Sequence, residues 1–278
     1  MRSVSHGVFL ETKFPGVMVG AVASHGRLLL VDAPIRVEDG REWVSQLSEK
    51  GRPRFMALLD HHLDRVLGAR GFELPLVSHD TTRLVMSAWP DTFKGGTRPI
   101  GAEADRLKRI TGVTRAVPDL TFSDELSLHL EGREIVLLHR PGPTAGSIWV
   151  VIPEAKAVFV GDAVWLSEPA YLGDAHLDAW RKTLQQATRG PFKGFTFISS
   201  RDGVVERKAF GQMAAWLDRV EERLRKLRPR GAAAEATNVL ATSLMRGCKL
   251  PAARREHAHL RLQAGLERLH ARWIVDED

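Results

Sequence analysis

One stretch, residues 58–68, constrains the fold of this chain more than any other. The apolar residues 55–59 end abruptly and are followed by Asp60, His62 and Asp64, and then by a segment with helical character. A short apolar run of this kind is typical of a buried strand. Because open α/β sheets place their chemistry at the carboxyl ends of strands, we expect the three polar side chains to form part of a site.

The size and composition of the chain narrow its class. Its 278 residues, 44% hydrophobic and 27% charged, suit one large α/β domain with an added segment, or two small domains. The single cysteine, Cys248, excludes an internal disulfide and a cysteine-cluster metal site, so any metal must be held by histidine and carboxylate groups. No apolar run is long enough to span a bilayer, and residues 1–6 lack a signal-peptide core, so we expect a soluble, cytoplasmic protein without a membrane partner.

The basic charge of the chain is concentrated near its end. From Arg201 onward there are 16 Lys/Arg against 11 Asp/Glu, a difference of +5 out of the +6 for the whole chain. The segment that carries the predicted site is not basic. Arginine-rich helical faces are usually solvated, so the distribution does not favour a nucleic-acid surface.

The remaining pattern divides into strands followed by helices. Strand-like runs of alternating or fully apolar residues cover the following ranges: 17–23, 27–32, 74–77, 126–130, 135–138, 147–152, 157–160 and 195–198. From Val204 onward, apolar residues recur at helical spacing, most clearly between Phe210 and Leu227. The pattern predicts a mixed α/β domain over residues 1–203 and a helical segment over residues 204–278 that packs on it.

Four segments resemble motifs of the metallo-β-lactamase superfamily. Asp60-x-His62-x-Asp64-Arg65 is similar to the family's His-x-His-x-Asp-His, with two of the three histidines replaced. Residues 139–147 resemble the loop Pro-Gly-His-Thr-x-Gly-Ser, with Pro143 in place of the ligand histidine.

The other two segments lie further along the chain. Phe159 to Asp162 resembles the strand ending in Gly-Asp whose aspartate bridges two metal ions. Asp202 stands where the family's last histidine is expected, before Gly203. The resemblance, closest to the hydroxyacylglutathione-hydrolase type, implies a metallo-β-lactamase-type αββα sandwich with a C-terminal helical extension.

The resemblance also implies a ligand set for the first metal position. Its members would be Asp60, His62 and Asp162, with Pro143 as a lost ligand because a proline ring offers no lone pair. Oxygen ligands in place of nitrogen weaken the preference for Zn and move it toward Mn, Fe or Mg. The expected cofactor is therefore one divalent metal ion (Zn, Mn or Fe) or none.

The second metal position would contain Asp64, Arg65 in place of a histidine, and Asp202. Arginine is always protonated and cannot ligate a metal, but its planar fork can hold two carboxylates. We therefore hypothesise that the Arg65 guanidinium replaces the second metal and pairs with some of Asp64, Asp162 and Asp202. Converging carboxylates without such a cation would repel one another.

Two functions follow from these expectations. The first is a hydrolase of esters, thioesters or phosphoesters with at most one metal ion, in which Asp64 or Asp202 orients the attacking water. The second is a catalytically inactive binding or interaction module that keeps the fold. The sequence identifies no small-molecule substrate or ligand, and it leaves a homo-oligomer open.

Overall fold

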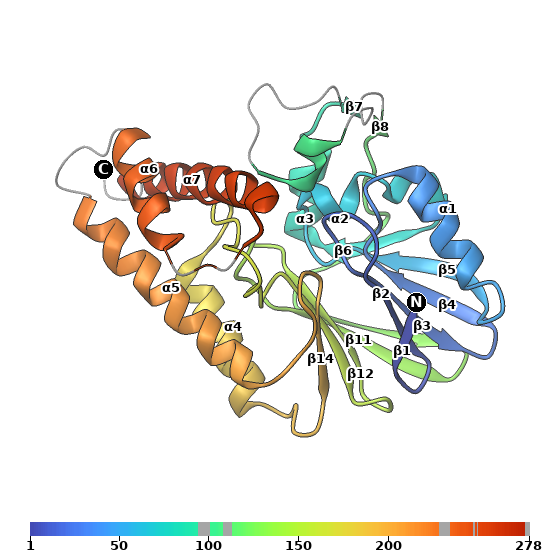
Figure 1. Ribbon diagram of the computed structural model, residues 1–278. Helices are drawn as coiled ribbons and strands as arrows, with labels where there is room; N and C mark the ends of the chain where they lie inside the picture. Colours follow the sequence, from blue (N-terminus) through green and yellow to red (C-terminus); the bar gives the residue numbers. More distant parts are fainter. Residues whose placement is uncertain (94–100, 108–112, 228–233, 247, 249, 276–278) are drawn as a thin grey trace.

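The computed structural model describes residues 1–93, 101–107, 113–227, 234–246, 248 and 250–275. Two β-sheets lie face to face with helices on both outer sides, which is the αββα sandwich expected from the sequence (Figure 1). A further group of helices, α5 to α7, extends the layer that covers the second sheet.

The first sheet has the strand order β1-β2-β3-β4-β5-β6-β9. Its strands are β1 (Arg2–Ser5), β2 (Val8–Glu11), β3 (Val19–Ser24), β4 (Arg27–Val31), β5 (Arg52–Ala57), β6 (Leu76–His79) and β9 (Leu120–Phe122). The strands from β4 to β9 pair in parallel. The helical elements on this half are α1 (Val37–Gln46), α2 (Leu63–Val66), η1 (Ala69–Phe72), α3 (Asp80–Ser87) and η2 (Glu103–Arg106).

The second sheet has the order β10-β11-β12-β13-β14-β15. Its strands are β10 (Glu125–Leu130), β11 (Arg133–His139), β12 (Ile148–Ile152), β13 (Ala157–Gly161), β14 (Thr196–Ser199) and β15 (Gly203–Val205). The helices on this half are α4 (Leu177–Arg189), α5 (Lys208–Leu227), α6 (Ala234–Leu244) and α7 (Ala252–Val275). A separate two-stranded ribbon joins β7 (Thr92–Phe93) and β8 (Val113–Thr114).

The period-two alternation of the strands explains the layers. In β4, Leu29 contributes to the core between the two sheets, whereas its neighbours Leu28 and Leu30 pack with Trp43 of α1 on the outer side. Successive side chains of a strand point to opposite faces, so a strand that is apolar at every position can fill two cores at once. The continuous apolar run in the sequence therefore corresponds to a strand covered on both sides.

The C-terminal helices share a core with the outer face of the second sheet. Trp149 of β12 and Leu177 and Trp180 of α4 belong to the same buried cluster as Phe210 of α5 and Leu262 of α7. The boundary at residue 203 between the predicted domain and the helical segment stays a prediction. In the described residues, no helix is both long and apolar enough to cross a membrane.

A stacked histidine pair joins the end of β6 in the first sheet to the end of β11 in the second. His79 accepts a hydrogen bond at Nδ1 from the Thr81 backbone N–H (3.0 Å) and thereby caps α3, while its Nε2 lies 2.8 Å from the Ser123 carbonyl oxygen. Its ring stacks on that of His139, with 3.8 Å between centroids. Burial, together with the neighbouring His139, lowers the pKa of His79.

We expect this pair to make stability depend on pH. A histidine whose pKa is lower in the folded state than its unfolded value of about 6.5 stabilises the fold above that pH, and the stabilisation is lost as the pH falls. His79→Asn keeps an acceptor suited to a helix N-cap but cannot titrate. Urea unfolding between pH 7 and pH 5 should show a shallower loss of stability for His79→Asn than for the parent chain.

A matched control for this prediction is His129→Asn, which changes an exposed histidine of β10. Its unfolding free energy should follow the pH dependence of the parent chain. If His79→Asn also follows that dependence unchanged, titration of His79 does not contribute to the pH dependence of stability.

Candidate functional site

Charged side chains from both sheets meet where the parallel strands end. Asp32 follows β4 directly, Asp60 comes three residues after β5, Asp162 follows β13, and Arg201 comes two residues after β14. Because β4 and β5 run parallel in one sheet and β13 and β14 in the other, their carboxyl ends lie at corresponding edges. The sandwich brings the two edges together, so groups far apart in the sequence become neighbours.

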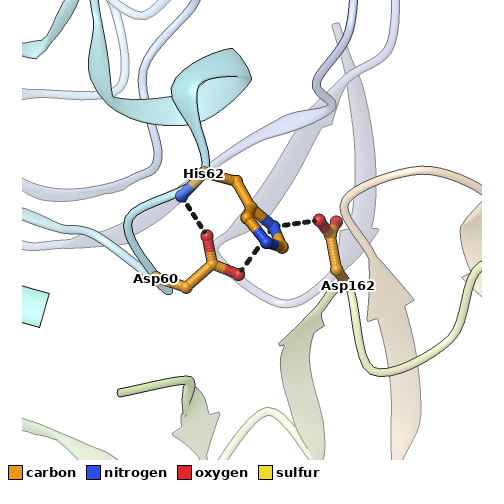
Figure 2. A group of neighbouring side chains, drawn as sticks. All are labelled: Asp60, His62 and Asp162. Atoms are coloured by element: carbon orange, nitrogen blue, oxygen red, sulfur yellow. Dashed lines mark hydrogen bonds and ion pairs between the residues drawn. The ribbon is translucent and has the colours of Figure 1, made fainter. Parts of the chain in front are cut away.

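Asp60, His62 and Asp162 form the group expected at the first metal position (Figure 2). Nδ1 of His62 lies 2.9 Å from Oδ2 of Asp162 and 3.5 Å from Oδ2 of Asp60, and the Asp60 Oδ1 accepts the His62 backbone N–H at 2.9 Å. One ligand atom from each of the three residues falls within 4.8 Å of the others. All three residues are buried. They lie together as expected from the sequence, and their role as metal ligands stays a prediction.

Arg65 lies entirely out of solvent in the middle of three aspartates. Its Nε forms an ion pair with Asp60 Oδ1 at 3.0 Å, its Nη1 donates to Asp32 Oδ2 at 3.1 Å, and its Nη2 donates to Asp162 Oδ1. The guanidinium therefore points into the site, as hypothesised. Its partners differ in part from those expected, because the described contacts join it to Asp32 and Asp60 and not to Asp64.

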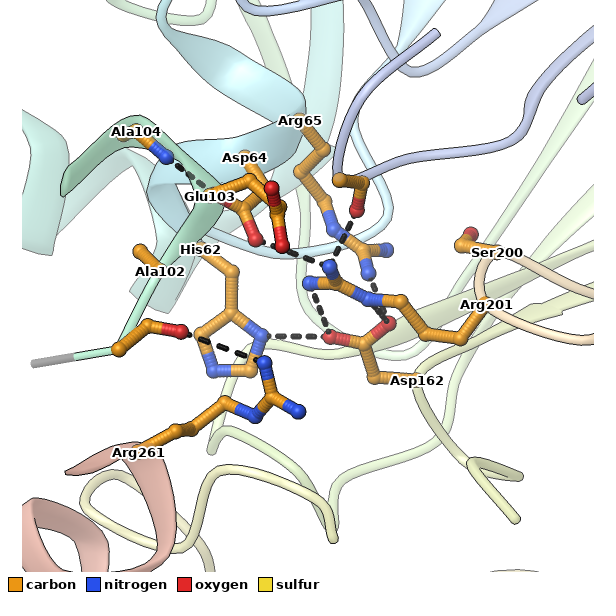
Figure 3. A network of polar contacts seen from close by, with 12 residues as sticks. His62, Asp64, Arg65, Ala102, Glu103, Ala104, Asp162, Ser200, Arg201 and Arg261 are labelled. Atoms are coloured by element: carbon orange, nitrogen blue, oxygen red, sulfur yellow. Dashed lines mark hydrogen bonds and ion pairs between the residues drawn. The ribbon is translucent and has the colours of Figure 1, made fainter. Parts of the chain in front are cut away.

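Arg201 supplies a second buried guanidinium, which the sequence analysis did not identify (Figure 3). Its Nε and Nη2 donate to the two oxygens of Asp162 at 2.8 and 3.1 Å, and its Nη1 donates to Asp64 Oδ2 at 2.9 Å and to the Gly16 carbonyl. The guanidinium also lies 4.2 Å from the ring centroid of Trp165. Arg201, and not Arg65, is thus the cation that joins Asp64 to Asp162.

Asp32 connects this group to the backbone. It adopts a left-handed conformation with φ of 60°, is completely buried, and accepts hydrogen bonds from the Leu59 N–H at 2.9 Å and from the Ser200 hydroxyl at 3.2 Å in addition to Arg65. A non-glycine residue at positive φ must be stabilised by its surroundings. Burial raises the pKa of Asp32 to about 6, against the opposing effect of Arg65.

Neighbouring charges lower the pKa of Asp162 and raise the pKa of His62. Burial alone would raise the pKa of Asp162, but the Arg201 and Arg65 guanidiniums hold it well below its usual range. Burial alone would lower the pKa of His62, but Asp60 and Asp162 raise it above the ordinary value. Asp162 therefore stays ionised, and His62 is favoured in its protonated form.

The structure does not bring every predicted residue to this site. Asp202 lies outside the group, because its carboxylate accepts the backbone N–H groups of Leu166 at 2.6 Å and Ser167 at 3.1 Å. Pro143 is buried in a loop closed by the Thr144 and Ser147 hydroxyls, 3.0 Å apart. The loop motif thus keeps its hydrogen bonds around a residue that cannot ligate a metal.

Arg201, which was not predicted from the sequence, comes directly before Asp202, which was. Arg201 and Asp202 both follow a buried strand, and the sequence motif aligned Asp202 with the family's last histidine. The available signal was charge: Asp60, Asp64 and Asp162 were expected to converge with only one cation among them. A second cation near the end of a neighbouring strand would have balanced the group better.

The donor set fits one metal ion at most. Asp60, His62 and Asp162 offer carboxylate and imidazole donors at suitable separations, provided that His62 Nδ1 gives up the proton directed at Asp162. At the second position Asp64 faces the guanidinium of Arg201, which has no lone pair and repels a cation. The residues there do not fit a metal.

A pocket of about 200 Å³ opens beside the group. Its charged lining residues include Asp64, Arg201 and Arg268, and its aromatic ones include Trp89 and Tyr171. Arg268 donates to the Tyr171 hydroxyl at 2.7 Å, and burial raises the pKa of Tyr171 to about 12. The pocket therefore offers a small molecule both ring surfaces and hydrogen-bond donors.

Removing one guanidinium should expose how strongly the group depends on it. Arg65→Met keeps most of the buried volume but leaves Asp32, Asp60 and Asp162 without this partner. Breaking a buried ion pair on one side costs about 3–5 kcal/mol, so we expect a loss of this size in urea unfolding at pH 7. The loss should shrink toward about pH 4, because protonation neutralises carboxylates that have lost their cation.

Arg41→Ala serves as the comparison, since Arg41 is exposed on α1. Its unfolding free energy should stay within about 0.5 kcal/mol of the parent chain. An Arg65→Met protein as stable as the Arg41→Ala protein at neutral pH would show that the aspartates do not need this cation.

Known proteins share this architecture. Residues 59–194 match the family model of the metallo-β-lactamase superfamily. A metallo-β-lactamase family protein from Thermus thermophilus has the same fold, with 17% identity, a TM-score of 0.67, and coverage of 99% of this chain and 95% of that one. A metallo-β-lactamase from Pontibacter korlensis has 17% identity and a TM-score of 0.59, covering 78% of this chain and 97% of its own.

The DIM-1 metallo-β-lactamase is also similar, at 16% identity and a TM-score of 0.61, with 78% of this chain and 96% of that chain covered. No curated protein sequence matches this chain. Identities this low establish a common fold and nothing about activity. The match over residues 59–194 shows that the chain contains a metallo-β-lactamase superfamily domain. The matched segment includes Asp60, His62 and Asp162.

Proposed function

We propose that this chain is a metal-independent binding module that uses the metallo-β-lactamase fold to hold a small molecule beside an arginine–aspartate centre. One observation carries the proposal: both oxygens of Asp162 already accept from buried cationic groups. Oδ1 accepts from Arg65 and Arg201, and Oδ2 accepts from Arg201 while facing His62. In the motif that this aspartate resembles, its oxygens would bridge two metal ions.

The charges of the centre support the same proposal. Four buried aspartates, Asp32, Asp60, Asp64 and Asp162, surround two guanidiniums that are protonated at any physiological pH. Asp60 and Asp162 raise the pKa of His62, which favours a third positive charge beside them, and burial raises the pKa of Asp32 to about 6. Most of the negative charge of the group is therefore balanced by cations of the chain itself.

The carboxylates of Asp64 and Asp202, which were expected to act as bases in a hydrolase, already accept hydrogen bonds from other groups of the protein. Asp64 accepts the Ala104 N–H at 3.2 Å through Oδ1 and Arg201 through Oδ2. Asp202 is hydrogen-bonded to two backbone N–H groups outside the pocket. A general base needs an oxygen within hydrogen-bond reach of the attacking water, and this arrangement favours binding over hydrolysis.

A second function, a hydrolase with one metal ion, is favoured by a different observation. Asp60, His62 and Asp162 converge within 4.8 Å, and they are the residues that would hold Zn, Mn or Fe. A divalent metal at such a site supplies Lewis acidity and lowers the pKa of bound water to about 7. The substrate would then be an ester, thioester or phosphoester that enters the pocket beside Tyr171.

Metal analysis separates the two functions. Inductively coupled plasma mass spectrometry should find substoichiometric metal in the purified protein, both before and after dialysis against Zn²⁺ or Mn²⁺, because the guanidiniums already occupy the carboxylates. His62→Ala, which removes the imidazole donor, should give the same low content. Exposed surface histidines contribute equally to both proteins, so the difference between them isolates the site.

The opposite outcome is equally specific. One equivalent of metal in the parent chain that is lost in His62→Ala would contradict the metal-independent proposal and establish the single-metal site. Hydrolase assays with ester, thioester and phosphoester substrates would then be the next step.

A further inference from the structure

A second, larger cavity shares Trp165 as a lining residue with the pocket beside the centre. It is a groove of about 890 Å³ between α5, the end of α6 and the loop that follows β13. Small-molecule pockets commonly measure about 300–1,000 Å³, so the groove has room for a metabolite-sized ligand. It takes no part in the function proposed above.

The side of α5 that faces the groove carries basic and not acidic groups. The lining residues of α5 follow helical spacing: Gln212, Ala215, Trp216, Arg219 and Arg223. None of the acidic residues of this helix lines the groove, because Asp218 and Glu221 pair with Arg181 of α4 and Glu222 pairs with Lys226. The charges of α5 are thus sorted, with positive groups left at the groove.

The guanidiniums of Arg219, Arg223 and Arg246 have no acidic ion-pair partner among the described residues. Among the described residues, neither Arg219 nor Arg246 has a hydrogen-bond or ion-pair partner for its side chain. Arg223 donates to the Ser243 hydroxyl at 2.9 Å, and Arg246 follows Ser243 by three residues, just past the end of α6. The one acidic residue in the described lining, Glu168, is already bound by two arginines of α7.

Asp202, which was expected at the metal site, instead fixes the loop that forms the other wall of the groove. Asp202 accepts the backbone N–H groups of Leu166 and Ser167, both of which line the groove. Trp165 is engaged by Arg201 and Arg261, each 4.2 Å from its ring centroid, so the half-buried ring of Trp216 supplies the free aromatic surface. The groove therefore combines a fixed wall, an aromatic ring and three arginines.

We propose that this groove binds a phosphate-bearing small molecule that also carries an aromatic ring, that is, a ligand of the nucleotide class. Guanidinium groups match phosphate oxygens with paired, charge-assisted hydrogen bonds, and several converging arginines favour a ligand with more than one negative charge. An aromatic ring of the ligand stacks on Trp216, and Arg219, Arg223 and Arg246 hold its phosphates.

Titration calorimetry of the full chain with ATP, in low-salt buffer without magnesium, tests the proposal. ATP should bind with saturation and more tightly than tripolyphosphate, and adenosine should bind far more weakly than either. Arg219→Gln and Arg223→Gln should each weaken ATP binding about tenfold, the effect of losing one charge-assisted hydrogen bond. Lys226→Gln removes a charge from α5 outside the groove and should leave the affinity unchanged.

Three results would overturn the proposal. They are absence of saturable binding to both ATP and tripolyphosphate, ATP binding that survives both arginine substitutions, and tighter arginine-dependent binding of a single-stranded oligonucleotide, which would indicate a nucleic-acid surface. A negative result at the groove would not contradict the proposed metal-independent centre, because Arg219→Gln and Arg223→Gln leave Asp60, His62 and Asp162 unchanged.

Discussion

The buried ion pairs of Asp162 with Arg65 and Arg201 are the interactions on which the rest of the site depends. Removing these charges from water is expensive, and the cost is recovered only when every carboxylate oxygen has a close cationic or N–H partner. Here each oxygen of Asp162, which follows a strand of the second sheet, has such partners, and Asp32 and Asp64 extend the pairing into the half built on the first sheet. The network joins the two halves of the sandwich by charge where metal ions would join them by coordination.

The fold tolerates this exchange because its loops keep their own hydrogen bonds. In the loop around Pro143, Gly142 donates to the Thr144 carbonyl at 3.0 Å, and the hydroxyls of Thr144 and Ser147 contact one another. None of these contacts involves the residue that faces a metal in the related motif. Ligand residues can therefore change while the backbone that presents them stays in place, which is why fold does not determine function.

The C-terminal helix α7 reaches the centre through a chain of arginines and acids. Arg261 pairs with Glu168 and stacks on Trp165, and Arg254 pairs with Glu103, next to the Ala104 N–H that donates to Asp64. The basic residues of the last helix thus balance acidic groups around the site. Part of the excess positive charge near the chain end is thus paired around the site, and another part lines the groove beside α5.

The sequence alone determined the layered fold and most of the centre, because those features depend on local pattern. Apolar runs predicted the strands, and the resemblance to the metallo-β-lactamase motifs implied that Asp60, His62, Arg65 and Asp162 would meet. It could not choose between Arg201 and its neighbours, since one residue of difference in a loop decides which side chain points inward.

Only the tertiary structure made that choice. The turn after β14 directs Arg201 toward Asp162 and Asp64 and turns Asp202 outward to the Leu166 and Ser167 N–H groups. The partners of Arg65 were decided in the same way, because Asp32 enters the site through a left-handed backbone conformation that residue type does not reveal. Pattern in a sequence specifies which strands end near one another, whereas the direction of each side chain depends on backbone angles and packing set by the whole fold.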